Sequence, residues 1–191
     1  MVRPQKKRRA RARNCVAVAA VGALAAGIVS IPAAPANAAD TITAADQAYF
    51  AYYGLDRARA KGYTGGGVTI AMIDGKVDTS VPELAGADIT VKIPCTINSS
   101  PAVATHGTGV ASILVSTDYG VAPKASLLAY QGTFGADGDQ GGSDCDDPSG
   151  VSKDSQPWLL NQAMNDGAQI INVSASTPNE YKELKWVTAR A

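Results

Sequence analysis

The sequence predicts an α/β domain built as three layers, a mostly parallel sheet with helices on both faces. Three apolar runs without polar alternation (68–73, 126–130 and 170–173) are typical of strands buried on both sides. Segments with helix signals lie between these runs, and strands that alternate with helices indicate a parallel sheet. Ligand chemistry in such sheets lies at the carboxyl ends of the strands, where Asp74 and the segment 172–174 stand.

Residues 1–38 have the pattern of a secretory signal peptide. Seven Lys and Arg and no acid lie in residues 1–14, an apolar stretch runs from Cys15 to about Ile31, and Ala36-Asn37-Ala38 is a small-residue cleavage pattern. A transmembrane anchor is the alternative, but the Pro-rich exit after Ile31 disfavours it. We therefore expect a secreted, extracellular protein without a stable membrane anchor, whose domain occupies residues 39–191.

Removal of this leader changes the charge of the chain. Seven of the 17 Lys and Arg lie in the leader, so ten remain against 17 Asp and Glu, a formal charge of −7. An acidic exported chain is a poor candidate for a nucleic-acid partner, and we expect none. The remaining length of about 153 residues suits one domain with its own core. These features leave the oligomeric state open.

The predicted elements follow in a regular order. A helix is expected over 43–62, where Thr43 and Asp46 form a capping pair, and the glycines 65–67 turn the chain into the first strand. The further expected elements are a short strand at 89–93, a helix at 106–116, a strand at 126–130, a Gly- and Asp-rich loop at 132–153, a helix begun by Ser155 and Pro157 and ended at Gly167, a strand at 170–173 and the start of a helix at 180–191.

Two cysteines, Cys95 and Cys145, remain after the leader is removed. We expect a disulfide between them because the protein is exported, with two buried thiols as the alternative. The segment 135–147 holds five Asp in 13 residues, but its spacing does not match an EF-hand loop. We interpret it as a solvated loop in which calcium is possible and no cofactor is certain. One His and two scattered Cys predict no other metal site.

Asp74 and His106 are the candidates for chemistry. Asp74 ends the first buried strand, and His106, the only histidine, opens a helix rich in small residues. A serine hydroxyl needs a general base within hydrogen-bond reach, and histidine is the usual base near neutral pH. That base needs a buried carboxylate to fix its tautomer, a role for which Asp74 is placed. The two residues would be two members of a nucleophilic triad.

Four motifs in order resemble those of subtilisin-like serine proteases, the subtilases. Gly67–Asp74 with Val77–Leu84 resembles the aspartate motif, and His106-Gly-Thr-Gly-Val-Ala-Ser112 is similar to the histidine motif. Gly120–Leu127 and Ile171–Ala175 resemble two segments that follow, and Asp precedes His as in subtilases. The resemblance spans roughly residues 67–176.

The resemblance implies a subtilisin-like fold and a secreted serine-type endopeptidase that acts on peptide or protein substrates. Asp74 would orient His106, and His106 would act as general base and later as acid. Ser174 and Ala175 would lie on an edge strand that binds the substrate as an added strand.

Three departures from the family pattern stand out. Asp74-Gly75-Lys76 replaces Asp-Thr/Ser-Gly, so the aspartate lacks its hydroxyl neighbour, and Lys76 either competes for Asp74 or points to solvent, which we favour. Gly109 replaces a second His and Ser176 replaces a Gly, changes that we expect to be tolerated. No serine after His106 has a G-x-S-x-G or G-T-S context, so the nucleophilic Ser is absent.

We therefore interpret the chain as the N-terminal part of a truncated subtilase domain that is inactive by itself. A truncated gene, a fragmentary gene model and one piece of a split gene fit equally well. The alternative function is a non-catalytic secreted peptide-binding module, a pseudoprotease, which needs the edge strand and no serine.

Overall fold

A parallel sheet forms the centre of the fold. The computed structural model describes residues 41–133 and 140–174, which lie in one compact unit, Ala38–Ala191. The sheet has the order β2-β4-β1-β6, and its three strand pairs are all parallel. Its strands are β1 (Thr69–Asp74), β2 (Asp88–Lys92), β4 (Ser126–Gln131) and β6 (Ile170–Val173). Asp74 pairs in register with Gln131, and Ile73 with Val173, so the carboxyl ends of these strands meet at one edge.

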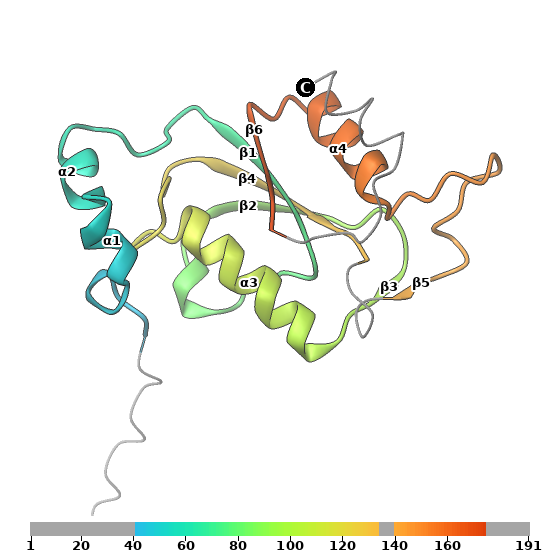
Figure 1. Ribbon diagram of the computed structural model, residues 1–191, viewed down its shortest axis with the longest axis horizontal. Coiled ribbons are helices and arrows are strands. Elements are labelled where there is room, and N and C mark those ends of the chain that lie inside the picture. The colour runs from blue at the N-terminus through green and yellow to red at the C-terminus, as the bar shows by residue number, and fades with distance from the viewer. Residues whose placement is uncertain (1–40, 134–139, 175–191) are drawn as a thin grey trace, which may run out of the picture. The chain divides into compact units, whose positions relative to one another are not determined.

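Two helices cover opposite faces of this sheet. They are α3 (Pro101–Val115) and α4 (Gln156–Asn165), which lie below and above the strands in Figure 1. Alternate residues of β1 point to opposite faces of the sheet and pack against different helices. Ile70 and Met72 pack in the cluster that contains Ala111 and Val115 of α3. Ala71 and Ile73 pack in the cluster that contains Leu159, Leu160 and Ala163 of α4. This double burial explains the apolar run without alternation and confirms the predicted three-layer α/β fold.

The segment before β1 differs from the single helix that the sequence predicts. It forms a 3-10 turn η1 (Ala44–Asp46) and two short helices, α1 (Ala48–Tyr52) and α2 (Leu55–Ala60). The break lies at Gly54, whose φ of 63° is left-handed and interrupts the helical hydrogen bonds. The expected capping pair is present, because the backbone N–H and Oγ1 of Thr43 both donate to Asp46 Oδ2.

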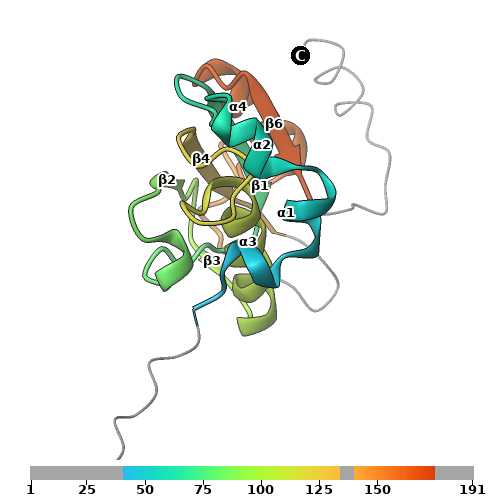
Figure 2. The same ribbon diagram turned by 90° about the vertical axis from the view of Figure 1, so that its left-hand side faces the viewer.

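This N-terminal segment binds the loop that follows α3. Figure 2 shows α1 and α2 on the side of the molecule nearest the viewer. Arg59 donates hydrogen bonds to the backbone carbonyls of Thr117, Asp118 and Gly120. A guanidinium is favourable here because the negative end of a helix dipole lies at its C-terminus. The segment thus holds the far end of α3.

A second, two-stranded antiparallel sheet lies beside the main one. It pairs β3 (Ile97–Asn98) with β5 (Gln140–Gly141), so the long loop predicted over 132–153 contains a short strand. The helix expected at 180–191 lies outside the described residues. Among the residues that the structure describes, no helix has the length and apolar character needed to span a membrane.

Candidate active site

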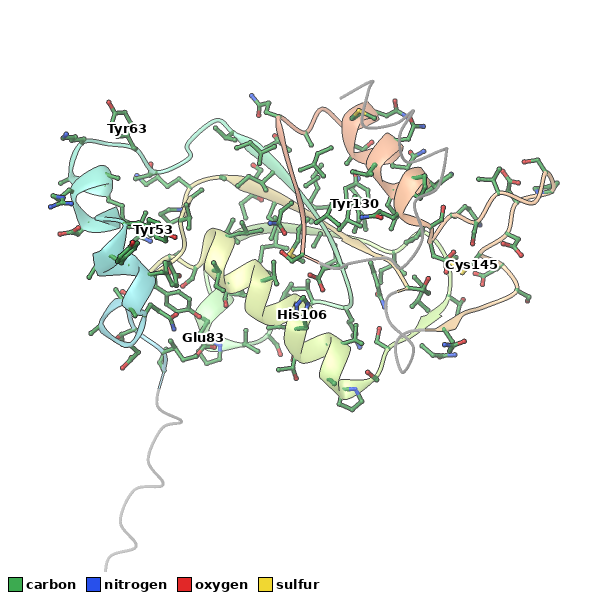
Figure 3. The ribbon with its side chains drawn as sticks, viewed as in Figure 1. Tyr53, Tyr63, Glu83, His106, Tyr130 and Cys145 are labelled. Atoms are coloured by element: carbon green, nitrogen blue, oxygen red, sulfur yellow. A yellow bond between two sulfur atoms is a disulfide. The ribbon has the colours of Figure 1, made fainter. Side chains whose placement is uncertain are left out.

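The structure brings Asp74 and His106 together. Asp74 ends β1 and is only 1% exposed, and its Oδ1 lies 2.9 Å from His106 Nδ1. The His106 side chain remains 52% exposed, so only one edge of the imidazole is occupied by the carboxylate. Figure 3 shows His106 on α3, on the side turned toward the sheet. With Nδ1–H donating to Asp74, the lone pair of the neutral ring lies on Nε2, the nitrogen that can accept a proton.

The helix that carries His106 begins earlier than the sequence predicts. It starts at Pro101 instead of opening at His106, which therefore lies in the second helical turn. Ser100 is the N-cap, because its Oγ accepts a hydrogen bond from the N–H of Val103, and Pro101 has the φ of a first helical residue. The Ser-Pro pair was the signal for this start. The extra turn fixes the orientation of the histidine more firmly than a helix end would.

A close approach of α3 to the chain after β1 creates the contact between the two residues. A side-chain carbon on Gly107 would lie 2.6 Å from the carbonyl oxygen of Lys76 and 2.8 Å from that of Gly75. The same loop is held by Thr108, whose Oγ1 accepts the N–H of Asp78 at 2.9 Å. The helix therefore lies directly on the backbone that follows Asp74, and only glycine fits at position 107.

The two oxygens of the Asp74 carboxylate have different surroundings. Oδ1 accepts from His106 and also from the N–H of Gly75 at 2.7 Å. Oδ2 is buried and has no hydrogen-bond partner among the described residues. The side chain of Lys76 is exposed. Hydrogen bonds from Ser80, with a smaller contribution from the charge of Lys76, lower the pKa of Asp78.

The strand ends beside Asp74 carry further polar side chains. Gln131, which is buried, donates from Nε2 to Ser99 Oγ at 2.7 Å and so ties β4 to the segment that leads into α3. Ser174 follows β6 and is exposed, with its Oγ donating to Asn172 Oδ1 at 2.9 Å. Ala175, the second predicted substrate-binding residue, lies outside the described residues.

Cys95 and Cys145 form a disulfide that links the two sides of the small sheet. The two cysteines are 50 residues apart in sequence, and their bond connects the segment before α3 to the Asp-rich loop. Asp154 lies beside it, and the three residues are the group of candidate metal ligands found among the described residues. Because the two sulfur atoms are bonded to each other, neither is a thiolate that could hold a metal ion.

The Asp-rich loop is described only in part, since residues 134–139 are outside the described ranges. Asp144 accepts from the N–H of Thr96, and this bond is the main reason why the pKa of Asp144 is lowered. Asp147 Oδ1 accepts from the N–H and Oγ of Ser149, which lowers the pKa of Asp147. These carboxylates thus serve to fold the loop.

Sequence reasoning missed three contributors to the site. Val103 contacts Gly75, and Gln131, which pairs with Asp74 across the sheet, donates to Ser99 just before α3. Each of the three is an ordinary residue in sequence. Gln131 is a polar side chain at the end of an apolar strand, which was the available signal for it. Nothing in the sequence marks Val103, because its role depends on a contact with Gly75 across the fold.

The site can fix an imidazole in one tautomer. Such a pair activates a hydroxyl or thiol nucleophile that reaches Nε2.

Comparisons with known proteins point to one family. The sequence profile of the subtilase family matches residues 65–190. Subtilisin E of Bacillus subtilis (strain 168) is 29% identical over 152 residues, covering 73% of this chain and 36% of the relative. Subtilisin of Bacillus pumilus is 28% identical over 152 residues, covering 73% and 50% of the two chains. The solved structure of the prenylagaramide maturation protease PagA is similar with a TM-score of 0.51 and 29% identity, covering 71% of this chain and 46% of that one. The chain thus spans half or less of the length of these relatives, and it belongs to the subtilase family.

Proposed function

We propose that this chain supplies the Asp–His half of a secreted serine endopeptidase of the subtilisin type. In this proposal His106 takes the proton of a serine hydroxyl through Nε2 and later gives it to the leaving amine. Asp74 holds the ring in the required tautomer and stabilises the imidazolium. The serine lies outside these 191 residues, so residues 39–191 alone are inactive.

One observation carries the proposal, namely the 2.9 Å contact between Asp74 Oδ1 and His106 Nδ1. A histidine that only filled space in a core would be buried with both nitrogens satisfied. Here the carboxylate is buried and the ring is half exposed, which is the asymmetry that a general base needs. The peptide-binding alternative requires the edge strand alone and gives no reason for this pair.

The substrate of the proposed enzyme is a peptide or protein segment. Support comes from β6, a strand at the edge of the described sheet whose carboxyl end lies beside that of β1. Ser174 continues β6 at the level of Asp74, so a peptide added along this edge would pass close to His106. Ser174 and Ala175 are proposed to contact the residue before the cleaved bond.

Export of the protein is part of the proposal. The basic head, apolar middle and Ala36-Asn37-Ala38 of the leader support it. The pairing of Cys95 with Cys145 supports an oxidising compartment, where disulfides persist. Calcium binding by the Asp-rich loop is proposed only as an accessory property. N-terminal sequencing of protein recovered from the medium should give Ala39 as the first residue.

The test uses the full product of the reading frame that contains these residues, compared with residues 39–191 alone. We expect the full product to hydrolyse a fluorogenic peptide and to be labelled by a fluorophosphonate at a serine beyond Ala191. Residues 39–191 should show neither property, because no serine in them lies in a nucleophile motif. Stoichiometric labelling of a serine within residues 39–191 would overturn this assignment. Peptide binding without labelling of the full product would favour the non-catalytic alternative.

A further inference from the structure

Within the part of the chain that the structure describes, the carboxylate of Asp74 is paired on one side only. Oδ1 receives hydrogen bonds from His106 and Gly75, whereas Oδ2 is buried without a partner among the described residues. Asp74 as a whole is 1% exposed, so bulk water does not solvate this oxygen freely. Buried carboxylate oxygens are normally hydrogen-bonded, and the residue next in sequence, Gly75, has no side chain that could donate to this one.

The neighbour in sequence, Gly75, could carry a side chain as far as the backbone is concerned. Gly75 is not among the glycines with positive φ, so an L-residue is not strained there. The obstacle is a side chain on α3. A carbon attached to Gly75 would lie 2.0 Å from Cγ1 of Val103 and 3.1 Å from the carbonyl oxygen of Val103. The first distance is far below van der Waals contact, so a residue other than glycine requires that Val103 move.

Val103 lies on the same helix as His106, three residues before it, and is partly buried. Residues three apart on a helix are neighbours on one face. A single side chain thus contacts the residue next to Asp74 and stands one turn from His106.

We infer that Val103 is a positioning residue for the Asp74–His106 pair and that it forms a coupled unit with Gly75. Its isopropyl group occupies the space above position 75, so that no side chain there can donate to Asp74 Oδ2. The carboxylate is held by Oδ1 and by the packing of α3 instead of by a hydroxyl on the following residue. A serine at position 75 becomes acceptable, and donates to Oδ2, only when Val103 is shortened. This inference rests on the proposed function for its catalytic meaning, but the contacts themselves do not depend on it.

A double-mutant cycle on the full chain tests the coupling. The variants are Gly75→Ser, Val103→Ala and the combination of the two, with Gly75→Ala/Val103→Ala to separate the hydroxyl from the added carbon. We expect Gly75→Ser alone to lower the unfolding midpoint by roughly 5 °C or more, since overpacking strains the core. Adding Val103→Ala should restore most of this loss. The serine double variant should unfold at a higher temperature than the alanine double variant.

A second readout follows His106 directly. It is the only histidine, so histidine-selective ¹⁵N labelling reports on it alone. We expect the Nδ1–H proton resonance to shift in Gly75→Ser/Val103→Ala, because a donor on Oδ2 withdraws charge from the carboxylate. It should stay near its parental position in Gly75→Ala/Val103→Ala. If Val103 had a packing role only, the unfolding midpoints would change but the Nδ1–H resonance would be the same in the two double variants.

Matched controls use a glycine on the same helix. A carbon attached to Gly109 meets nothing within 4 Å, so Gly109→Ser should be additive with Val103→Ala. The inference is overturned if Gly75→Ser alone is as stable as the parent. It is also overturned if the two double variants match in midpoint or in resonance, or if both fail to fold while Val103→Ala folds. These measurements need no turnover, so an inactive full product would refute the proposed function and leave this result intact.

Discussion

Gly107 of α3 lies so close to Lys76 that a side-chain carbon on the glycine would be 2.6 Å from the lysine carbonyl oxygen. This contact places α3 against the backbone that follows β1. It is the reason why His106, the preceding residue, can reach a carboxylate at the end of a buried strand. The same side-chain carbon on Gly107 would lie 2.8 Å from the carbonyl oxygen of Gly75.

Gly107→Ala should therefore destabilise the protein although alanine is the better helix former. Two backbone carbonyls oppose the new methyl group, and neither can rotate away, so we expect a loss of about 1–3 kcal/mol in the free energy of unfolding. Gly109→Ala is the matched control. Its methyl group meets nothing within 4 Å, so it should stabilise the helix by up to about 1 kcal/mol. Chemical denaturation of both variants decides the matter, and equal effects would refute the close approach.

In the full product, His106→Ala should abolish turnover and leave the fold intact. His106 is the only histidine, so no neighbouring imidazole replaces it, and loss of a triad base costs on the order of 10⁶ in kcat. Asp74→Asn should cost on the order of 10⁴, since the amide can favour the wrong tautomer. Steady-state kinetics on a generic peptide measure both losses. A His106→Ala variant with near-parental kcat would end the catalytic interpretation.

Lys76→Gly, in the loop that follows Asp74, should not reduce activity, in contrast to His106→Ala and Asp74→Asn. The Lys76 side chain is exposed, and its charge helps to lower the pKa of Asp78. Activity should hold or rise when this cation, two residues from Asp74, is removed. The assay is the same peptide hydrolysis. A large loss would show that Lys76 has a role in the aspartate motif of this protein.

Protein recovered from the medium should contain the Cys95–Cys145 disulfide and no free thiol at either position, as judged by non-reducing peptide mapping. Replacing both cysteines with serine should cost about 2–4 kcal/mol, because the bond closes a 50-residue separation and so restricts the unfolded chain. The loss should be absent when parent and variant are compared under reducing conditions. A parent with two free thiols would contradict the prediction.

Asp166 should make stability depend on acid pH. A hydrogen bond from the hydroxyl of Tyr130 at 2.7 Å, and secondarily Lys92 at 3.2 Å, lower the pKa of Asp166 in the folded protein. The stabilisation that ionised Asp166 contributes is thus complete above the pKa of the unfolded chain, about 3.9. It is lost as the pH falls through the lower pKa of Asp166 in the folded protein. Asp166→Asn should unfold at a lower temperature than the parent at neutral pH. Its unfolding temperature should fall less than that of the parent on acidification from about pH 5 to pH 2.

Tyr130→Phe is the matched control for this pair. It keeps the aromatic ring in the cluster with Leu159 and Ala163 but removes the donor to Asp166. Its dependence on acid pH should lie between those of the parent and Asp166→Asn, because Lys92 still pairs with the carboxylate. Thermal unfolding at a series of pH values checks both variants. An Asp166→Asn protein with the parental dependence would exclude a role for this carboxyl group.

The sequence by itself determined the strands and the two catalytic candidates. β1 and β4 are largely buried on both faces, so their apolar runs predicted them well. The expectation of two-sided burial was wrong for β6, which lies at the edge of the described sheet with Ile170 52% exposed. Asp74 and His106 could be named because their motifs are short and local. The N-terminal helices show the limit of such signals, since Gly54 in a left-handed conformation divided what was expected to be one helix.

Only the tertiary structure decided how the two candidates meet. The close contacts at Gly75 and Gly107 join residues about 30 positions apart in the chain. Local sequence patterns do not specify contacts between residues so far apart. Among the described residues Asp74 Oδ2 has no partner, and the role that we infer for Val103 there depends on a contact that exists only once α3 lies on β1. Local preferences choose the elements, whereas the steric fit between elements sets the geometry of the site.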